Sequence, residues 1–235
     1  MRLITAVYSD PARAIKPHEL MAENLRRSAE RLGYELTIHQ LESNPVVFAT
    51  KDYYRLDCAF KPFLIQKELE TATEPVCWVD ADCLIRERFD EILDGVHLAV
   101  TMRPLELRRN QGQVYDGFIN AGVMAFTATD AARTIVDYWI KELKRSRSDQ
   151  DAMTYVLLRE SKLLSESEVI RSFPALVRIA PTRVYNFFHF PDDWSQAKVL
   201  HVKGIHRPEE YDEIARAVLG KDAVPTAGAK EEACR

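Results

Sequence analysis

The chain has 235 residues and a mass of 27.0 kDa, and 46% of its residues are hydrophobic, which is enough for one domain with a sizeable core. Its formal net charge of −4 gives no overall attraction to nucleic acid or to an anionic membrane. No run of about 18 apolar residues occurs, and the N-terminus lacks the pattern of a signal peptide, so a cytoplasmic protein without a transmembrane segment is expected. The cysteines are too scattered for a zinc site and are interpreted as reduced thiols: Cys58, Cys77, Cys83 and Cys234.

Strand-like and helix-like segments alternate along the chain. Short apolar runs predict strands at residues 3–8, 34–38, 76–79, 97–102, 118–126, 176–180 and 198–202. Helical spacing of apolar residues predicts helices at residues 17–32, 60–69, 130–143 and from about 149, and Gly33 is expected to end the first. This alternation predicts an α/β fold with a mostly parallel central sheet and helices on both faces. The small polar segment 221–235 is expected to be a disordered tail.

Two polar segments between these elements are predicted to be loops, at residues 42–57 and 103–117. The second is the candidate for a mobile lid or an acceptor contact, because long polar loops often carry function. Its candidate contact residues are Arg103, Arg108, Arg109 and Tyr115.

Two carboxylates stand one residue apart at the end of an apolar run. Asp80 and Asp82 follow the predicted strand Val76–Val79, and the chain is apolar again from Cys83. Side chains two residues apart on a strand point to the same face, so the two acids are expected to lie side by side. Like charges at that distance repel, so the pair is unfavourable unless a cation or a shared proton lies between them, and hard divalent cations prefer oxygen ligands. The pair predicts Mg²⁺ or Mn²⁺ holding a phosphate-bearing substrate at the carboxyl edge of the sheet, with a structural Asp-x-Asp turn as the alternative.

Four segments carry a resemblance to a known family. They are Trp78-Val79-Asp80-Ala81-Asp82, Ile119-Asn120-Ala121-Gly122-Val123, Ser148-Asp149-Gln150-Asp151 after the helix with Trp139, and His201-Val202-Lys203-Gly204-Ile205-His206-Arg207-Pro208. In this order they resemble the metal-dependent glycosyltransferases of the GT-A fold, particularly the retaining enzymes of the glycogenin and galactosyltransferase type. The chain departs from the family pattern at Arg207, where Lys is usual, and at Glu209, where Trp is usual.

The resemblance implies a single GT-A (Rossmann-like) domain at residues 1–220 and a hexosyltransferase-type enzyme. Such an enzyme moves a sugar from a nucleotide-diphosphate donor to an acceptor, here with retention of configuration. The resemblance also makes His201 the third metal ligand beside Asp80 and Asp82, and this oxygen and nitrogen set favours Mn²⁺ over Mg²⁺. The implied nucleotide and diphosphate contacts are Tyr8, Asp10, Lys61, Asp80, Ala81, Gly204 and Arg207. The implied contacts to the reacting sugar are Asn120, Asp149, Gln150 and Asp151.

Each role has a structural alternative. Outside the motif, His201 would be a satisfied core histidine and Lys61 an exposed helix lysine, while Tyr8 could simply pack. Asp149 and Asp151 would then cap a helix and stabilise its dipole.

Two other functions are open, a sugar-1-phosphate nucleotidyltransferase and a non-catalytic nucleotide-binding protein. The first would carry a glycine-rich loop after the first strand, whereas residues 8–13 contain no glycine. The sequence does not distinguish a glycan, a lipid-linked glycan, a protein and a small molecule as the acceptor.

Overall fold

The computed structural model describes residues 1–8, 16–41, 60–103, 119–146, 148–158, 166–188, 190–202 and 208–226. The chain divides into two compact units that are interleaved in sequence. Unit 1 comprises Met1–Ser43, Val79–Phe89 and Arg183–Arg235, and unit 2 comprises Asn44–Trp78 and Asp90–Thr182. The single domain expected at residues 1–220 stays a prediction.

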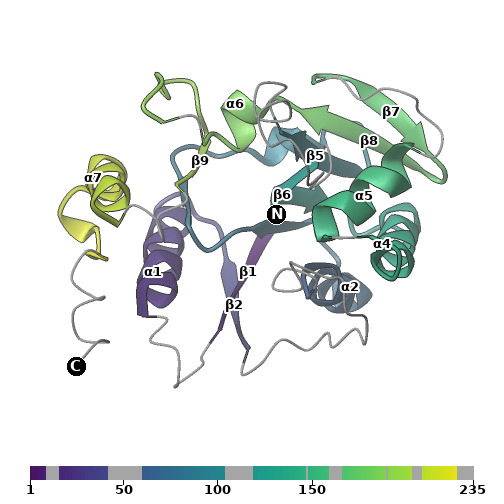
Figure 1. The fold of residues 1–235 in the computed structure, drawn as a ribbon, viewed down its shortest axis with the longest axis horizontal. Coiled ribbons are helices and arrows are strands. Elements are labelled where there is room, and N and C mark those ends of the chain that lie inside the picture. Colours follow the sequence, from purple (N-terminus) through teal and green to yellow (C-terminus); the bar gives the residue numbers. More distant parts are fainter. Residues whose placement is uncertain are drawn as a thin grey trace. The chain divides into compact units, whose positions relative to one another are not determined.

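Unit 1 is organised around one long helix. Its elements are β1 (Arg2–Tyr8), α1 (Lys16–Glu30), β2 (Leu36–Leu41), β4 (Cys83–Ile85), most of α6 (Thr182–Tyr185), β9 (Val199–His201), α7 (Pro208–Leu219) and η4 (Gly220–Asp222). Strands β1 and β2 are parallel, and α1 packs on β1, β4 and α7, as the neighbouring purple and yellow helices in Figure 1 show. Gly33 has a φ of 73° and follows α1, so it ends this helix as predicted.

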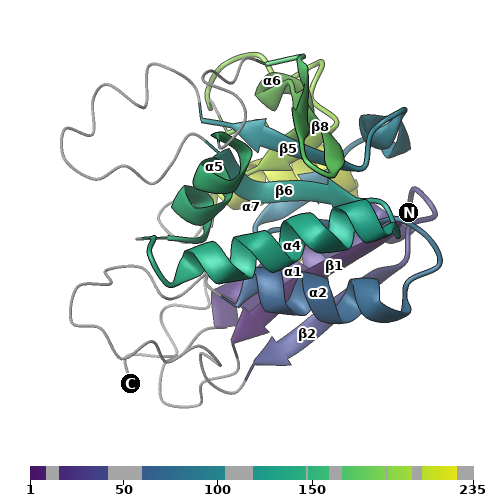
Figure 2. The ribbon, with the colours of Figure 1, turned by 90° about the vertical axis from the view of Figure 1, so that its right-hand side faces the viewer.

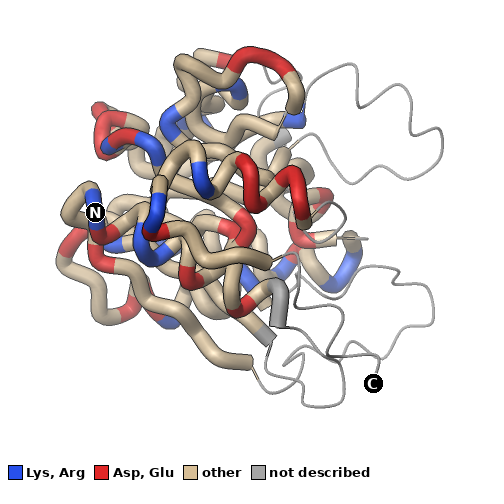
Figure 3. Tube along the Cα trace, turned by 90° about the vertical axis from the view of Figure 1, so that its left-hand side faces the viewer, with Lys and Arg blue, Asp and Glu red and all other residues tan. Residues whose placement is uncertain are grey.

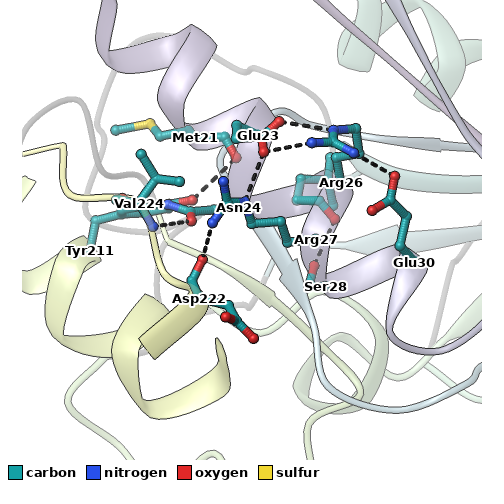
Figure 4. A network of polar contacts seen from close by, with 11 residues as sticks. Met21, Glu23, Asn24, Arg26, Arg27, Ser28, Glu30, Tyr211, Asp222 and Val224 are labelled. Carbon is teal, nitrogen blue, oxygen red and sulfur yellow. Dashed lines mark hydrogen bonds and ion pairs between the residues drawn. The ribbon is translucent and has the colours of Figure 1, made fainter. Parts of the chain in front are cut away.

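The C-terminal part of unit 1 is fastened to α1 by polar contacts (Figure 4). The buried Asn24 side chain donates to Val224 O at 2.8 Å and accepts from Val224 N at 2.7 Å. Arg27 Nη1 donates to Asp222 O at 2.6 Å. Thr226 is fully buried and donates to Asp212 Oδ1 from both its amide and its hydroxyl. Residues 221–226, which the sequence places in a free tail, are therefore packed against the unit, and residues 227–235 lie outside the described residues.

Among its described residues, unit 2 combines three strands that are buried along their whole length, two that are partly exposed, and three α-helices. Its elements are α2 (Lys61–Thr71), β3 (Val76–Val79, whose last residue belongs to unit 1), η2 (Asp90–Leu93), β5 (Leu98–Met102), β6 (Ile119–Phe126), α4 (Asp130–Leu143), α5 (Asp149–Leu158), β7 (Val169–Ser172) and β8 (Ala175–Ala180). Every residue of β3, β5 and β6 is buried, which explains why these strands read as continuous apolar runs. Helix α4 lies beside α2 and contacts α5 (Figure 2).

The strands of the described residues form two sheets. Seven strands have the order β2-β1-β3-β6-β5-β8-β7, and β4 pairs with β9 in a two-stranded antiparallel sheet. In the large sheet β5 is parallel to β8 and antiparallel to β6, and β7 is antiparallel to β8. The expected α/β fold with a mostly parallel central sheet is confirmed.

The surface charges agree with a weak net charge. Basic and acidic residues, blue and red in Figure 3, are interspersed along the trace. In the part of the chain that the structure describes, no helix combines the length and apolar character needed to cross a membrane. The predicted loops 42–57 and 103–117 lie outside the described residues, apart from Arg103.

Candidate functional site

The end of β9 is fixed beside the turn that carries the acid pair. Antiparallel pairing of β4 with β9 places Cys83 opposite His201. The Val202 amide donates to Asp82 O at 3.1 Å, and the His201 amide donates to Phe187 O at 2.7 Å. Residues from two distant parts of the sequence therefore meet at one point of unit 1.

Asp80 and Asp82 lie in a turn between β3 and β4, so strand alternation is not what brings them together. Strand β3 ends at Val79, and the Cys83 amide closes the turn by donating to Asp80 O at 3.0 Å. Both carboxylates nevertheless face one imidazole. His201 Nε2 lies 3.3 Å from Asp82 Oδ1 and 3.8 Å from Asp80 Oδ2. The His201 side chain is 7% exposed, whereas those of Asp80 and Asp82 are 23% and 19% exposed, so the cluster opens to solvent on its carboxylate side.

A buried amide orients the imidazole. His201 Nδ1 lies 2.9 Å from Asn186 Oδ1, and Asn186 is fully buried. An amide oxygen only accepts hydrogen bonds, so Nδ1 carries the proton and donates. Nε2 therefore faces the carboxylates, and it offers its lone pair to a cation once its own proton has left, as in the arrangement that metal-binding histidines commonly have. Sequence patterns gave no indication of Asn186, because its contact depends on how the chain folds back before β9.

The charge state of Asp82 suits a ligand. Burial by itself would raise its pKa, but the charge of His201 and its hydrogen bond outweigh burial and lower the pKa from 3.8 to about 2. His18 adds a further favourable charge interaction. Asp82 is therefore ionised at neutral pH, as a metal-ligating carboxylate must be.

The donor atoms at this point fit a divalent cation. Two carboxylates and an imidazole offer the oxygen and nitrogen ligands that Mn²⁺ and Mg²⁺ accept in proteins. The structure adds a residue that the sequence patterns did not indicate. One donor atom from each of Asp82, Cys83 and His201 lies within 4.8 Å of the other two. Finding Cys83 from sequence would require knowing the register of β4 against β9.

Lys61 is a buried residue of unit 2. It is 5% exposed, and its Nζ donates to Ala121 O at 3.3 Å. The same atom lies 3.9 Å from Asp149 Oδ2 and 5.5 Å from the centroid of the Trp78 ring. The alternative of an exposed helix lysine is therefore wrong. A buried ammonium requires such partners, because it has lost its hydration.

The predicted sugar contacts lie on β6 and at the start of α5. Asn120 is 4% exposed, and its Oδ1 accepts from the Gly122 amide at 2.9 Å. With its amide turned to satisfy both ends, Gln150 donates to Ile119 O at 3.1 Å and accepts from Arg103 Nη2 at 3.2 Å.

The two acids beside Gln150 are also buried. Asp149 is 1% exposed and Asp151 7% exposed. Ser148 Oγ accepts from the Asp151 amide at 3.1 Å, so a serine hydroxyl caps α5 and the acids are not needed for that role.

The remaining predicted contacts are placed only in part. Ala81 is buried and packs against Val7 and Ala22 within unit 1. Tyr8 is the last residue of β1, and its side chain is not described. Asp10, Gly204 and Arg207 lie outside the described residues.

The chain matches no protein-family model and no curated protein, but it resembles solved structures. A glycosyltransferase involved in the glycosylation of the major capsid of PBCV-1 aligns over 93% of this chain and 100% of its own, with a TM-score of 0.59 and 15% identity. The bifunctional glycosyltransferase WbbM aligns over 98% of this chain and 51% of its own, with a TM-score of 0.52 and 12% identity. Mouse xyloside xylosyltransferase 1 aligns over 86% of this chain and 97% of its own, with a TM-score of 0.50 and 12% identity. The chain therefore has the fold of GT-A-type glycosyltransferases, as its four motifs implied.

Proposed function

We propose that this chain is a hexosyltransferase-type glycosyltransferase that moves a sugar from a nucleotide-diphosphate donor to an acceptor with the help of a divalent cation. The observation that carries the proposal is the convergence of Asp80 and Asp82 on His201 Nε2 in a chain with this fold. In a pure scaffold these three groups would contribute only an ion pair, whereas they provide a metal-dependent transferase with its ligands.

Asp80, Asp82 and His201 would hold the cation, with Mn²⁺ favoured because the ligands are mixed oxygen and nitrogen donors. When bound, it supplies Lewis-acid stabilisation of the diphosphate that leaves the anomeric carbon. The chain itself keeps the ligands ready. His201 lowers the pKa of Asp82, and Asn186 fixes the ring with Nε2 directed toward the carboxylates.

We assign recognition of the donor sugar to four polar residues, of which three are buried and Gln150 is partly exposed. They are Asn120, Asp149, Gln150 and Asp151. Their hydrogen-bonding groups suit sugar hydroxyls, and a buried polar site rejects a wrong sugar because its groups would stay unpaired. From the family resemblance, nucleotide and diphosphate contacts are proposed for Tyr8, Asp10, Lys61, Ala81, Gly204 and Arg207. Retention of configuration, with the leaving phosphate accepting the proton of the acceptor, rests on the same resemblance.

A panel of nucleotide sugars tests this proposal by thermal unfolding. With Mn²⁺, the cognate donor should raise the melting temperature by several degrees, because a ligand at 100 times its Kd stabilises the folded state by about 2.7 kcal/mol. EDTA should abolish the shift. Asp82→Asn should lose both the shift and metal-dependent release of nucleoside diphosphate, while Asp130→Asn, at a side chain that is 99% exposed, should retain both.

Other outcomes of this panel would overturn the proposal. Absence of any donor-dependent shift would contradict nucleotide-sugar binding. Binding without transfer to any acceptor and without hydrolysis would favour the non-catalytic protein. Formation of a nucleotide sugar from a nucleoside triphosphate and a sugar 1-phosphate would favour the nucleotidyltransferase.

A further inference from the structure

We propose that Cys83 supplies a sulfur ligand to this metal centre, so that Asp82, Cys83 and His201 bind a thiophilic divalent cation such as Zn²⁺ or Co²⁺. The inference rests on the proposed function only in treating Asp82 and His201 as metal ligands. It concerns which cations the site accepts.

The register of the small sheet holds the Cys83 side chain at the site. Cys83 faces His201 across the antiparallel pair, and the next pairs, Leu84 with Leu200 and Ile85 with Val199, are fully buried. Directly opposite residues of such a pair have Cβ atoms about 4.5–5.5 Å apart, so their side chains are in reach of one cation. Cys83 itself is fully buried, which leaves its thiol no solvent-facing alternative.

The distances suit a small tetrahedral cation. Oxygen and nitrogen ligands about 2.0 Å from a tetrahedral Zn²⁺ lie about 3.3 Å from each other. Asp82 Oδ1 and His201 Nε2 already lie 3.3 Å apart. A sulfur ligand about 2.3 Å from the cation would lie about 3.6 Å from the nitrogen. In the structure, the donor atoms of the three residues are all within 4.8 Å of one another. A side-chain movement of about 1 Å would therefore bring the three atoms to ligand distances.

The ligand chemistry separates two classes of cation. Thiolate is a soft ligand that favours zinc and other thiophilic metals, whereas Mg²⁺ prefers carboxylate, carbonyl and water oxygen. The oxygen-rich set with Asp80 and the sulfur-containing set with Cys83 share Asp82 and His201. A hard cation bound by the first set and a thiophilic cation bound by the second would therefore compete for the same position. Burial that disfavours a free thiolate is offset by the charge of the bound cation.

The chain offers a matched control for the thiol. Cys77 is also fully buried and free, but it lies on β3, where its Sγ donates to Trp78 O at 3.5 Å. Cys58 and Cys234 lie outside the described residues, so both are replaced by serine in a common background. Cys83→Ser and Cys77→Ser are then compared in that background.

Cobalt spectroscopy is the first test. Titrating the background chain with Co²⁺ should produce a sulfur-to-cobalt charge-transfer absorption that saturates at one equivalent. Cys77→Ser should keep this absorption. Cys83→Ser should lose it, and its affinity for Co²⁺ and Zn²⁺ should fall at least about tenfold, the lower limit for losing even a partner of a metal ligand. An absorption that persists in Cys83→Ser, or that never forms in the background chain, would overturn the proposal.

A second measurement uses the unsubstituted chain and does not depend on the folding of a variant. X-ray absorption at the zinc edge should show one sulfur at about 2.3 Å beside nitrogen and oxygen at about 2.0 Å. A shell of nitrogen and oxygen alone would refute the sulfur ligand. A zinc–sulfur shell in a protein that no nucleotide sugar stabilises would support this inference while refuting the proposed function, so the two failures are distinguishable.

Discussion

At the scale of single residues, the candidate metal centre depends on a group that is not itself a ligand. Asn186 accepts a hydrogen bond from His201 Nδ1 in a fully buried position. Partners of this kind fix the tautomer and the ring orientation of ligating histidines. Asn186 thereby fixes the orientation of the ring. The affinity of the candidate centre for a cation should therefore depend on Asn186, although Asn186 is not a ligand.

The first prediction concerns this partner. Asn186→Ala should weaken Mn²⁺ binding by about 10–100-fold, because the imidazole loses its fixed orientation. Asn186→Asp keeps an oxygen acceptor and should restore much of the affinity. Calorimetric titration with Mn²⁺ measures both. Equal affinities of Asn186→Ala and the unsubstituted chain would show that the contact serves packing alone.

A second prediction concerns the metal-free protein in acid. The pKa of Asp82 is lowered to about 2, so its ionised form stabilises the fold above the ordinary carboxyl pKa of 3.8, and this stabilisation is lost as the pH falls toward about 2. The effect is worth up to about 2 kcal/mol. In EDTA, the free energy of unfolding of the unsubstituted chain should exceed that of Asp82→Asn at pH 5, and the difference should shrink as the pH is lowered. A difference that stays constant down to pH 2 would contradict the ion pair with His201.

At the scale of elements, α1 joins two parts of unit 1. Its Ser28 Oγ accepts from the Ile85 amide of β4 at 3.0 Å. Arg31, the first residue after α1, donates from Nη1 to Val218 O of α7 at 2.6 Å, and Asn24 of α1 is hydrogen-bonded to Val224, which follows η4. One helix thus supports the strand that follows the acid pair and the segment that follows β9.

The third prediction tests this helix. Asn24→Ala should lower the free energy of unfolding by about 2 kcal/mol, because two buried hydrogen bonds to Val224 are lost at about 1 kcal/mol each. Arg26→Ala, on the same helix, removes only surface ion pairs with Glu23 and Glu30 and should cost no more than about 0.5 kcal/mol. Urea unfolding compares the two variants. Similar losses in both would show that Asn24 does not fasten the C-terminal segment.

Helix α7 shows how much of an element its sequence can reveal. Pro208 stands at the first helical position, Glu209 and Glu210 follow in the first turn, and the buried Tyr211, Ile214 and Val218 recur at helical spacing. These are ordinary helix signals. The predicted elements do not include this helix, because its first residue, Pro208, also ends the His201–Pro208 motif. The information was present in the sequence, unlike that for Asn186, whose role depends on tertiary contacts.

At the scale of the whole molecule, the fold could be predicted because its buried strands are continuous apolar runs and its helices have clear periodicity. The acid pair could be found because carboxylates at the end of a buried strand are conspicuous. The geometry of the site could not be predicted from the sequence. Asp80 and Asp82 lie in a turn where an extended strand was expected, and Cys83 joins them through a pairing between segments more than a hundred residues apart. Such pairings depend on topology, which local patterns do not specify.

The pairing of β4 with β9 also has a consequence for biosynthesis. A chain emerging from the ribosome presents Asp80 and Asp82 long before His201 has been made, so a cation could find the proposed ligand set only after β9 exists. Closing so long a loop is entropically costly and slow, and the cost is offset only once the late strand and the helix after it have packed. A cation at the proposed centre could therefore not act as an early template for folding. It would stabilise only molecules in which β4 and β9 have already paired. Metal affinity would then report how much of the chain is correctly folded.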